Sequence, residues 1–141
     1  MDRQILTTIL NDSQLREELT WMVKHFKSIG VENCKVLFGF SWGNEYYSNP
    51  KWVEEEIPLS WLLTKVSEVE STGIGSLGRD DLFVWVSGVE FQFCHDGDVH
   101  IHFNEPTNSL VEVFFERWQC LGYKPSEWVK TTERGPGTKV R

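Results

Sequence analysis

Two histidines and a glutamate in the second half of the chain are of residue types that bind metal ions. His100 and His102 are two positions apart in a segment of alternating apolar and polar residues, so both side chains project from one face of a strand. Glu90 belongs to the preceding alternating segment, and a hairpin between the two segments places it opposite His102. Two imidazoles and a carboxylate predict a site for a transition metal such as zinc. The alternative is that these residues form ordinary cross-strand polar pairs and that the protein has no cofactor.

Two further patterns lack the context that catalysis needs. Cys94 and His95 are adjacent, so on a strand their side chains point to opposite faces. Gly73, Gly75 and Gly78 match the letters of the dinucleotide-binding motif G-x-G-x-x-G, but a helical segment precedes them and a strand follows, the reverse of what that motif requires. We therefore expect a loop at these glycines, and a binding protein in preference to an enzyme.

Tryptophans outside the apolar patterns, together with acidic runs, are typical of a surface that binds another protein. Trp42 lies in a turn-like segment, and Trp85 falls on the polar side of its strand. The predicted partner-binding residues are Trp42, Glu54, Glu55, Glu56, Asp80, Asp81, Trp85, Asp96 and Asp98. The alternatives are that helices cover Trp85 in a larger core and that the acidic runs are only solvated.

The charge of the chain favours a basic partner. The 14 basic and 21 acidic residues give a net charge of −7. Five basic and two acidic residues follow Tyr123, so residues 1–123 carry 9 basic and 19 acidic groups, a net charge of −10. Such a body repels the phosphates of nucleic acids and attracts basic proteins. The alternative is that the acidity only keeps the protein in solution.

Length and composition predict one ordinary domain. The chain has 141 residues, of which 40% are hydrophobic and 25% charged. The sequence shows neither an apolar run long enough for a membrane span nor the pattern of a signal peptide, so we expect no membrane partner. Cys34, Cys94 and Cys120 are an odd number of widely spaced cysteines, which predicts reduced thiols in the cytoplasm. We expect residues 1–133 to form the domain and the basic tail, residues 134–141, to be disordered.

The order of the patterns predicts an α+β fold in which N-terminal, middle and C-terminal helices pack on an antiparallel sheet. Helical patterns cover residues 2–10, 13–29, 59–71 and 108–121, a strand pattern covers 34–40, a turn and a return strand follow from residue 41, and residues 52–57 form an edge or loop.

Residues 82–103 predict a three-stranded meander. Ser87-Gly88 is a two-residue turn, and the three-residue loop 95–97 has Gly97 in the left-handed conformation. With this register Phe91 lies opposite Ile101 on an apolar face, and Glu90 lies opposite His102 on a polar face.

A small acidic domain rich in tryptophan resembles the immunity proteins of bacterial polymorphic-toxin systems. The resemblance lies in size, charge and style, and includes the segment 93–103. It implies an intracellular inhibitor that neutralises a cognate toxin, in some systems a basic nuclease, by binding it. The second interpretation is a metal- or small-ligand-binding protein or enzyme that uses Glu90, His100 and His102.

Overall fold

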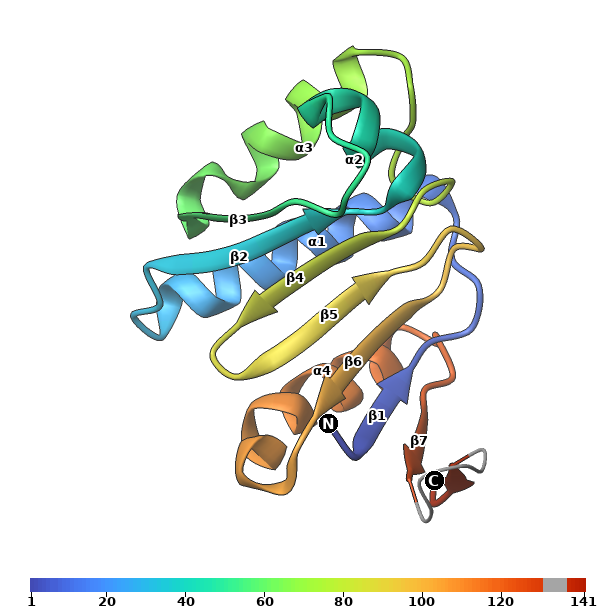
Figure 1. The fold of residues 1–141 in the computed structure, drawn as a ribbon. Helices are drawn as coiled ribbons and strands as arrows, with labels where there is room; N and C mark the ends of the chain where they lie inside the picture. The colour runs from blue at the N-terminus through green and yellow to red at the C-terminus, as the bar shows by residue number, and fades with distance from the viewer. Residues whose placement is uncertain (131–136) are drawn as a thin grey trace.

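An eight-stranded antiparallel sheet forms the centre of the computed structural model (Figure 1). The structure describes residues 1–130 and 137–141, and only the backbone of Phe40 and Ser41. The sheet order is β3-β2-β4-β5-β6-β1-β7-β8. The strands are β1 (Arg3–Leu6), β2 (Asn33–Phe38), β3 (Glu54–Pro58), β4 (Leu82–Val86), β5 (Val89–Phe93), β6 (Val99–Phe103), β7 (Ser126–Val129) and β8 (Thr138–Lys139). The helices are α1 (Asp12–Ser28), α2 (Phe40–Tyr47), α3 (Leu62–Ser71) and α4 (Asn108–Cys120), with short 3₁₀ turns at Leu59–Trp61 and Glu105–Thr107.

The helices leave one face of the sheet uncovered. In Figure 1, α1 and α4 lie behind the sheet, and α2 and α3 lie beyond β2 and β3 at one end. The predicted α+β fold, with helices from three parts of the chain packed on an antiparallel sheet, is confirmed. None of the helices in the described part of the chain has the length and apolar character that crossing a membrane requires.

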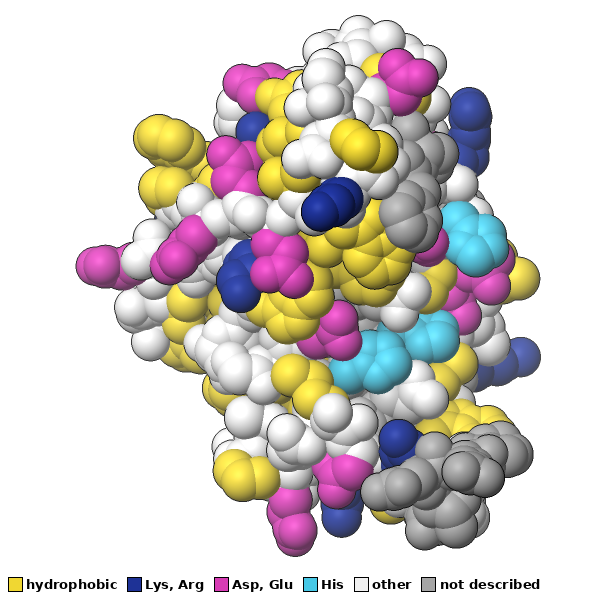
Figure 2. Space-filling model, viewed as in Figure 1, with side chains coloured by type: hydrophobic (Ala, Val, Ile, Leu, Met, Phe, Trp, Pro, Cys, Tyr) yellow, Lys and Arg dark blue, Asp and Glu magenta, His cyan; other side chains and the backbone are white. Residues whose placement is uncertain are grey.

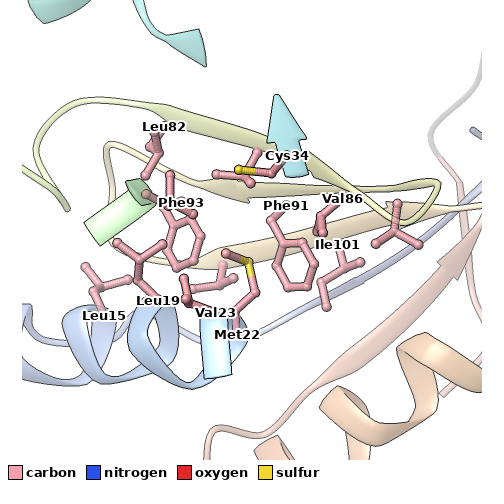
Figure 3. Packing of buried hydrophobic residues seen from close by; sticks show 14 of the residues in the cluster. Leu15, Leu19, Met22, Val23, Cys34, Leu82, Val86, Phe91, Phe93 and Ile101 are labelled. Carbon is pink, nitrogen blue, oxygen red and sulfur yellow. The ribbon is translucent and has the colours of Figure 1, made fainter. Parts of the chain in front are cut away.

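The core lies between the sheet and α1 and α4. The predicted stripe on α1 faces the strands, and its Leu19, Met22 and Val23 lie against Phe91 and Ile101 in the cluster of Figure 3. Helix α1 begins at Asp12 because Asn11 and Gln14 form a capping box, in which each side chain accepts a hydrogen bond from the other residue's backbone N–H at 2.9 Å.

A buried ion pair joins α1 to α4. The Glu18 side chain is 3% exposed, and its carboxylate accepts a hydrogen bond from Arg117 at 2.8 Å and one from the indole N–H of Trp118 at 2.7 Å. The Arg117 guanidinium also stacks over the Trp21 ring, 4.4 Å from its centroid. These contacts give the Glu18 charge the partners that its burial requires.

The meander has the predicted register. Glu90 pairs with His102, Phe91 with Ile101 and Phe93 with Val99. The loop between β5 and β6 is closed by a hydrogen bond from Gly97 N to Cys94 O of 3.0 Å, and Gly97 has a φ of 99°. The left-handed conformation at Gly97 confirms the three-residue loop.

Two predicted elements are wrong. Residues 3–6 form strand β1 instead of a helix, because β1 fills the place between β6 and β7, where Ile5 pairs with Ile101 and with Glu127. Residues 40–47 form helix α2 instead of a turn and a strand. The helix can fold back against the end of β2 because Gly43 has no side chain: a Cβ there would lie 2.1 Å from Phe38 O.

The end of the chain differs from the predicted disordered tail. Residues 134–136 lie outside the described residues, but β8 pairs with β7, and the Arg141 guanidinium bonds the carboxylates of Glu112 and Glu127. Arg141 also stacks on the Phe115 ring of α4, 3.8 Å from its centroid, so the described part of the tail closes over that helix.

Candidate functional site

The uncovered side of the sheet, which we term the open face, brings together polar and aromatic side chains from distant parts of the sequence. The cross-strand pairs Lys35–Trp85, Trp85–Glu90, Glu90–His102, His102–Gln4 and Gln4–Trp128 run across it from β2 to β7. Side chains of directly opposed residues share one face of a sheet, so these six residues form one row. Figure 2, viewed from this side, shows histidine, acidic and hydrophobic side chains gathered over the strands.

Three aromatic rings lie side by side at the β2–β4 end of the open face. The Phe83 ring centroid is 5.9 Å from that of Trp52 and 6.2 Å from that of Trp85. Trp52 is 47% exposed, and Phe83 and Trp85 are partly exposed. We term Trp52, Phe83 and Trp85 the aromatic row. Since no described helix packs over Trp85, the alternative that helices cover it in a larger core does not hold.

The predicted pair of Glu90 and His102 is adjacent but is not an ion pair. Burial raises the pKa of Glu90. Burial, together with the nearby His100, lowers the pKa of His102 to about 4. Both shifts favour the uncharged form, whereas an ion pair would shift both pKa values in the opposite directions. Glu90 and His102 therefore do not stabilise each other's charged forms.

The three consecutive glutamates of β3 do not share one face of the sheet, because side chains alternate between the two faces along a strand. Glu54 and Glu56 are exposed and lie on the open-face side, opposite Leu37 and Lys35. Glu55 projects to the other side, where Lys65 Nζ lies 2.9 Å from its carboxylate and the Tyr47 hydroxyl donates a hydrogen bond to it at 2.8 Å. Only Glu54 and Glu56 can therefore contribute to a surface on the open face.

Burial corrects the interpretation of Trp42 as a surface anchor. Its side chain is 0% exposed, its ring centroid lies 4.9 Å from that of Phe38, and its indole N–H donates a hydrogen bond to Asp81 O at 2.8 Å. Asp80 is buried as well, and it accepts a hydrogen bond from Ser76 N at 2.9 Å. Both residues hold the end of β4 and its neighbouring loops in place.

The other predicted acidic residues gather at the end of the open face. Asp81 accepts hydrogen bonds from the backbone and ring nitrogens of His95, at 2.8 and 3.1 Å. Asp96 is exposed in the β5–β6 loop. Asp98 lies 2.8 Å from His100 Nε2.

The predicted metal ligands need a correction. The rings of His100 and His102 stack with 6.0 Å between their centroids, but the group of three metal-binding side chains that converges among the described residues is Cys94, Asp98 and His100. Their ligand atoms all lie within 4.8 Å of one another. His100 thus belongs to the group, whereas Glu90 and His102 do not. The sequence could have indicated this group of three residues, because the predicted register of the meander places Cys94 beside Asp98 on the polar face.

One sequence motif was missed. Residues 39–43, Gly-Phe-Ser-Trp-Gly, match the motif G-x-S-x-G of serine hydrolases. Gly39 links β2 to α2 and residues 40–43 begin α2, so a strand precedes the motif and a helix contains most of it, and Gly39 N donates a hydrogen bond to Asp81 O at 2.9 Å. The pair of Asp81 and His95 therefore lies next to the motif. A difference from α/β-hydrolases is that both neighbours of β2 are antiparallel to it.

Comparisons of the chain with protein-family models, with curated proteins and with solved structures found no match.

Proposed function

We propose that the protein is an inhibitor of the immunity type, which binds a basic protein partner through its open face. The observation that carries this proposal is the aromatic row, a set of three contacting rings that remains partly exposed on an uncovered sheet. Tryptophan side chains at the centre of an interface supply much of its binding energy. No covalent chemistry is needed for such an inhibitor to block its partner.

The surroundings of the aromatic row suit a basic side chain. A shallow hollow of about 250 Å³ is lined by Lys35, Glu56 and Trp85, among others. A partner arginine in this hollow would stack on the Trp85 indole and pair with the Glu56 carboxylate. The excess of acidic residues in the body of the chain supports the same choice of partner, because it accelerates the approach of a basic protein and repels nucleic acid.

We also propose that the protein acts in the cytoplasm. Cys34 and Cys94 are buried free thiols, and Cys120 is an exposed one. An exposed unpaired thiol is typical of a reducing compartment.

The test is capture of partners from the native host at low ionic strength, followed by expression of the captured protein alone and with its inhibitor. We expect a basic protein that is toxic alone and harmless in the presence of this chain. Trp85→Ala should weaken the complex by about 2 kcal/mol, roughly 30-fold in Kd, because it removes an anchor of the interface. Trp61→Ala is the matched control, since Trp61 is 63% exposed and lies outside the open face.

The glutamates of β3 provide an internal control in the same measurement. The double variant Glu54→Gln/Glu56→Gln should slow association severalfold at low salt, and Glu55→Gln should not, because only the first two lie on the open-face side. Equal effects of Trp85→Ala and Trp61→Ala, or a captured partner without toxicity, would contradict the proposal.

A second candidate function is hydrolysis of an ester or amide. It is favoured by the position of the Asp81–His95 pair beside the motif at residues 39–43. In a serine hydrolase, serine attacks the carbonyl carbon, histidine accepts its proton and aspartate orients the histidine. The chain order Ser41, Asp81, His95 is that of the α/β-hydrolase triad.

For this second function we expect hydrolysis of p-nitrophenyl acetate and labelling by a fluorophosphonate. Ser41→Ala should abolish the labelling, because the reagent bonds to the serine oxygen, and hydrolysis should fall by roughly 10³-fold in Ser41→Ala and in His95→Gln, because the members of a triad act as a unit. Ser60→Ala, at an exposed serine away from the motif, should retain both. Hydrolysis that Ser41→Ala leaves unchanged would exclude this candidate.

A further inference from the structure

Cys94, Asp98 and His100 form a compact cluster where the β5–β6 hairpin loop meets the open face. Their ligand atoms lie within 4.8 Å of one another, a spacing that small side-chain movements reduce to the separations around a single ion. The cluster is mostly shielded from solvent: Cys94 is 7% exposed, and the side chains of Asp98 and His100 are 15% and 22% exposed. We propose that Cys94, Asp98 and His100 bind a zinc ion.

The donor set fits zinc. Thiolate, imidazole and carboxylate are the three protein ligand types that zinc uses, whereas magnesium and calcium prefer sites made of oxygen ligands alone. A tetrahedral ion with three protein ligands keeps a fourth position for water or for an incoming group.

Two polar atoms at the cluster support a bound cation. Asp98 Oδ1 is buried and has no hydrogen-bond partner in the described structure, whereas Oδ2 lies 2.8 Å from His100 Nε2. His100 Nδ1 lies 3.2 Å from Gln4 Oε1, while Nε2 points to Asp98 at 2.8 Å. This arrangement is typical of a metal-binding histidine, in which the nitrogen away from the ion donates to an amide oxygen.

Binding of a divalent cation at Cys94 is coupled to loss of the thiol proton. Burial, together with the neighbouring Asp98, Asp96 and Asp81, raises the pKa of the Cys94 thiol and opposes this loss. A zinc ion would offset these carboxylates and bind the thiolate, and one proton would be released to solvent.

The backbone holds the ligands in place before an ion binds. Cys94 N donates to Asp98 O at 2.9 Å, which closes the loop of the hairpin. The loop is fixed to the chain after β1, because Leu10 N donates to Gly97 O at 3.0 Å and Val99 N donates to Thr7 Oγ1 at 3.0 Å. Asp98 and His100 are two positions apart and project from the same side of the chain.

The experiment is titration of the full, chelator-treated chain with Co²⁺, followed by displacement with Zn²⁺. We expect one Co²⁺ per chain, a thiolate-to-cobalt charge-transfer absorption in the near ultraviolet, loss of that absorption on adding Zn²⁺, and a higher Tm with Zn²⁺. Cys94→Ser should remove the absorption. His100→Gln should weaken binding at least about 100-fold, and Gln4→Ala about 10-fold, as expected for a ligand and for its supporting residue.

His102→Gln and Glu90→Gln are the matched controls, because both residues lie beside the cluster on the same face and are not in it. They should bind Co²⁺ like the parent chain. Cys94→Ala replaces Cys94→Ser if the serine variant does not fold, as judged by circular dichroism. The proposal is overturned if the parent chain shows no charge-transfer absorption, if Cys94→Ser and Cys94→Ala retain it, or if the control variants abolish it. None of these outcomes bears on the partner-binding surface, whose test uses Trp85.

Discussion

Replacing Trp42 by alanine should lower the free energy of unfolding by about 4 kcal/mol, because it empties a large, fully buried site and breaks a buried hydrogen bond. The Trp42 side chain is 0% exposed and contacts Phe38, and its indole N–H donates to the backbone of Asp81. No backbone movement can refill the cavity easily, since Gly43 already brings α2 against the end of β2. The variant should also loosen the attachment of α2 to the sheet.

The measurement is urea denaturation at neutral pH, monitored by circular dichroism because the substitution itself removes a fluorophore. Trp61→Ala is the control: it removes the same side chain from a site that is 63% exposed, and it should change stability by less than about 0.5 kcal/mol. Similar losses in the two variants would show that Trp42 is not packed as described. A loss confined to Trp42→Ala would confirm that its role is structural.

Glu18→Ala should cost about 3 kcal/mol, because it leaves the Arg117 guanidinium and the Trp118 indole N–H without their buried acceptor. Arg117 keeps its stacking on Trp21, but that contact does not replace a carboxylate. The effect should be much larger than for an exposed glutamate of the same helix. Glu17→Ala provides that comparison, since Glu17 is exposed.

A double-mutant cycle separates the contribution of the ion pair. Arg117→Met removes the charge while keeping an apolar stem against Trp21, so Glu18→Ala should cost less in that background than in the parent chain. The coupling energy is expected to be about 1–3 kcal/mol. Additive effects of Glu18→Ala and Arg117→Met in chemical denaturation would mean that the two charges do not interact in the folded protein.

The parts of the fold that could be predicted are those whose local pattern agrees with their surroundings. The meander follows from strict alternation and from Gly97, because slipping the register by one residue would bury Gln92 and expose Phe91. Strand β1 could not be predicted in this way. Its four residues have no pattern of their own, and they become a strand only because β6 and β7 leave a place between them.

The residues of the candidate site could likewise be predicted only in part. Alternation identified Trp85, Glu90 and His102 as residues of one face, which the structure shows. It could not indicate that Trp42 would be buried, because the close approach of α2 depends on a single missing side chain at Gly43. The motif at residues 39–43 was readable from the letters alone, whereas its proximity to Asp81 and His95 required the tertiary structure.

The place of β1 in the sheet has a consequence for how the chain is made. β1 is synthesised before the other strands, whereas its partners β6 and β7 are synthesised late. Ile5 can therefore pair with Ile101 and Glu127 only after those residues have left the ribosome. Until then the inner edges of the growing sheet have free backbone N–H and C=O groups, which other chains can pair with. A chaperone that holds residues 3–6 during synthesis would therefore raise the yield of folded protein.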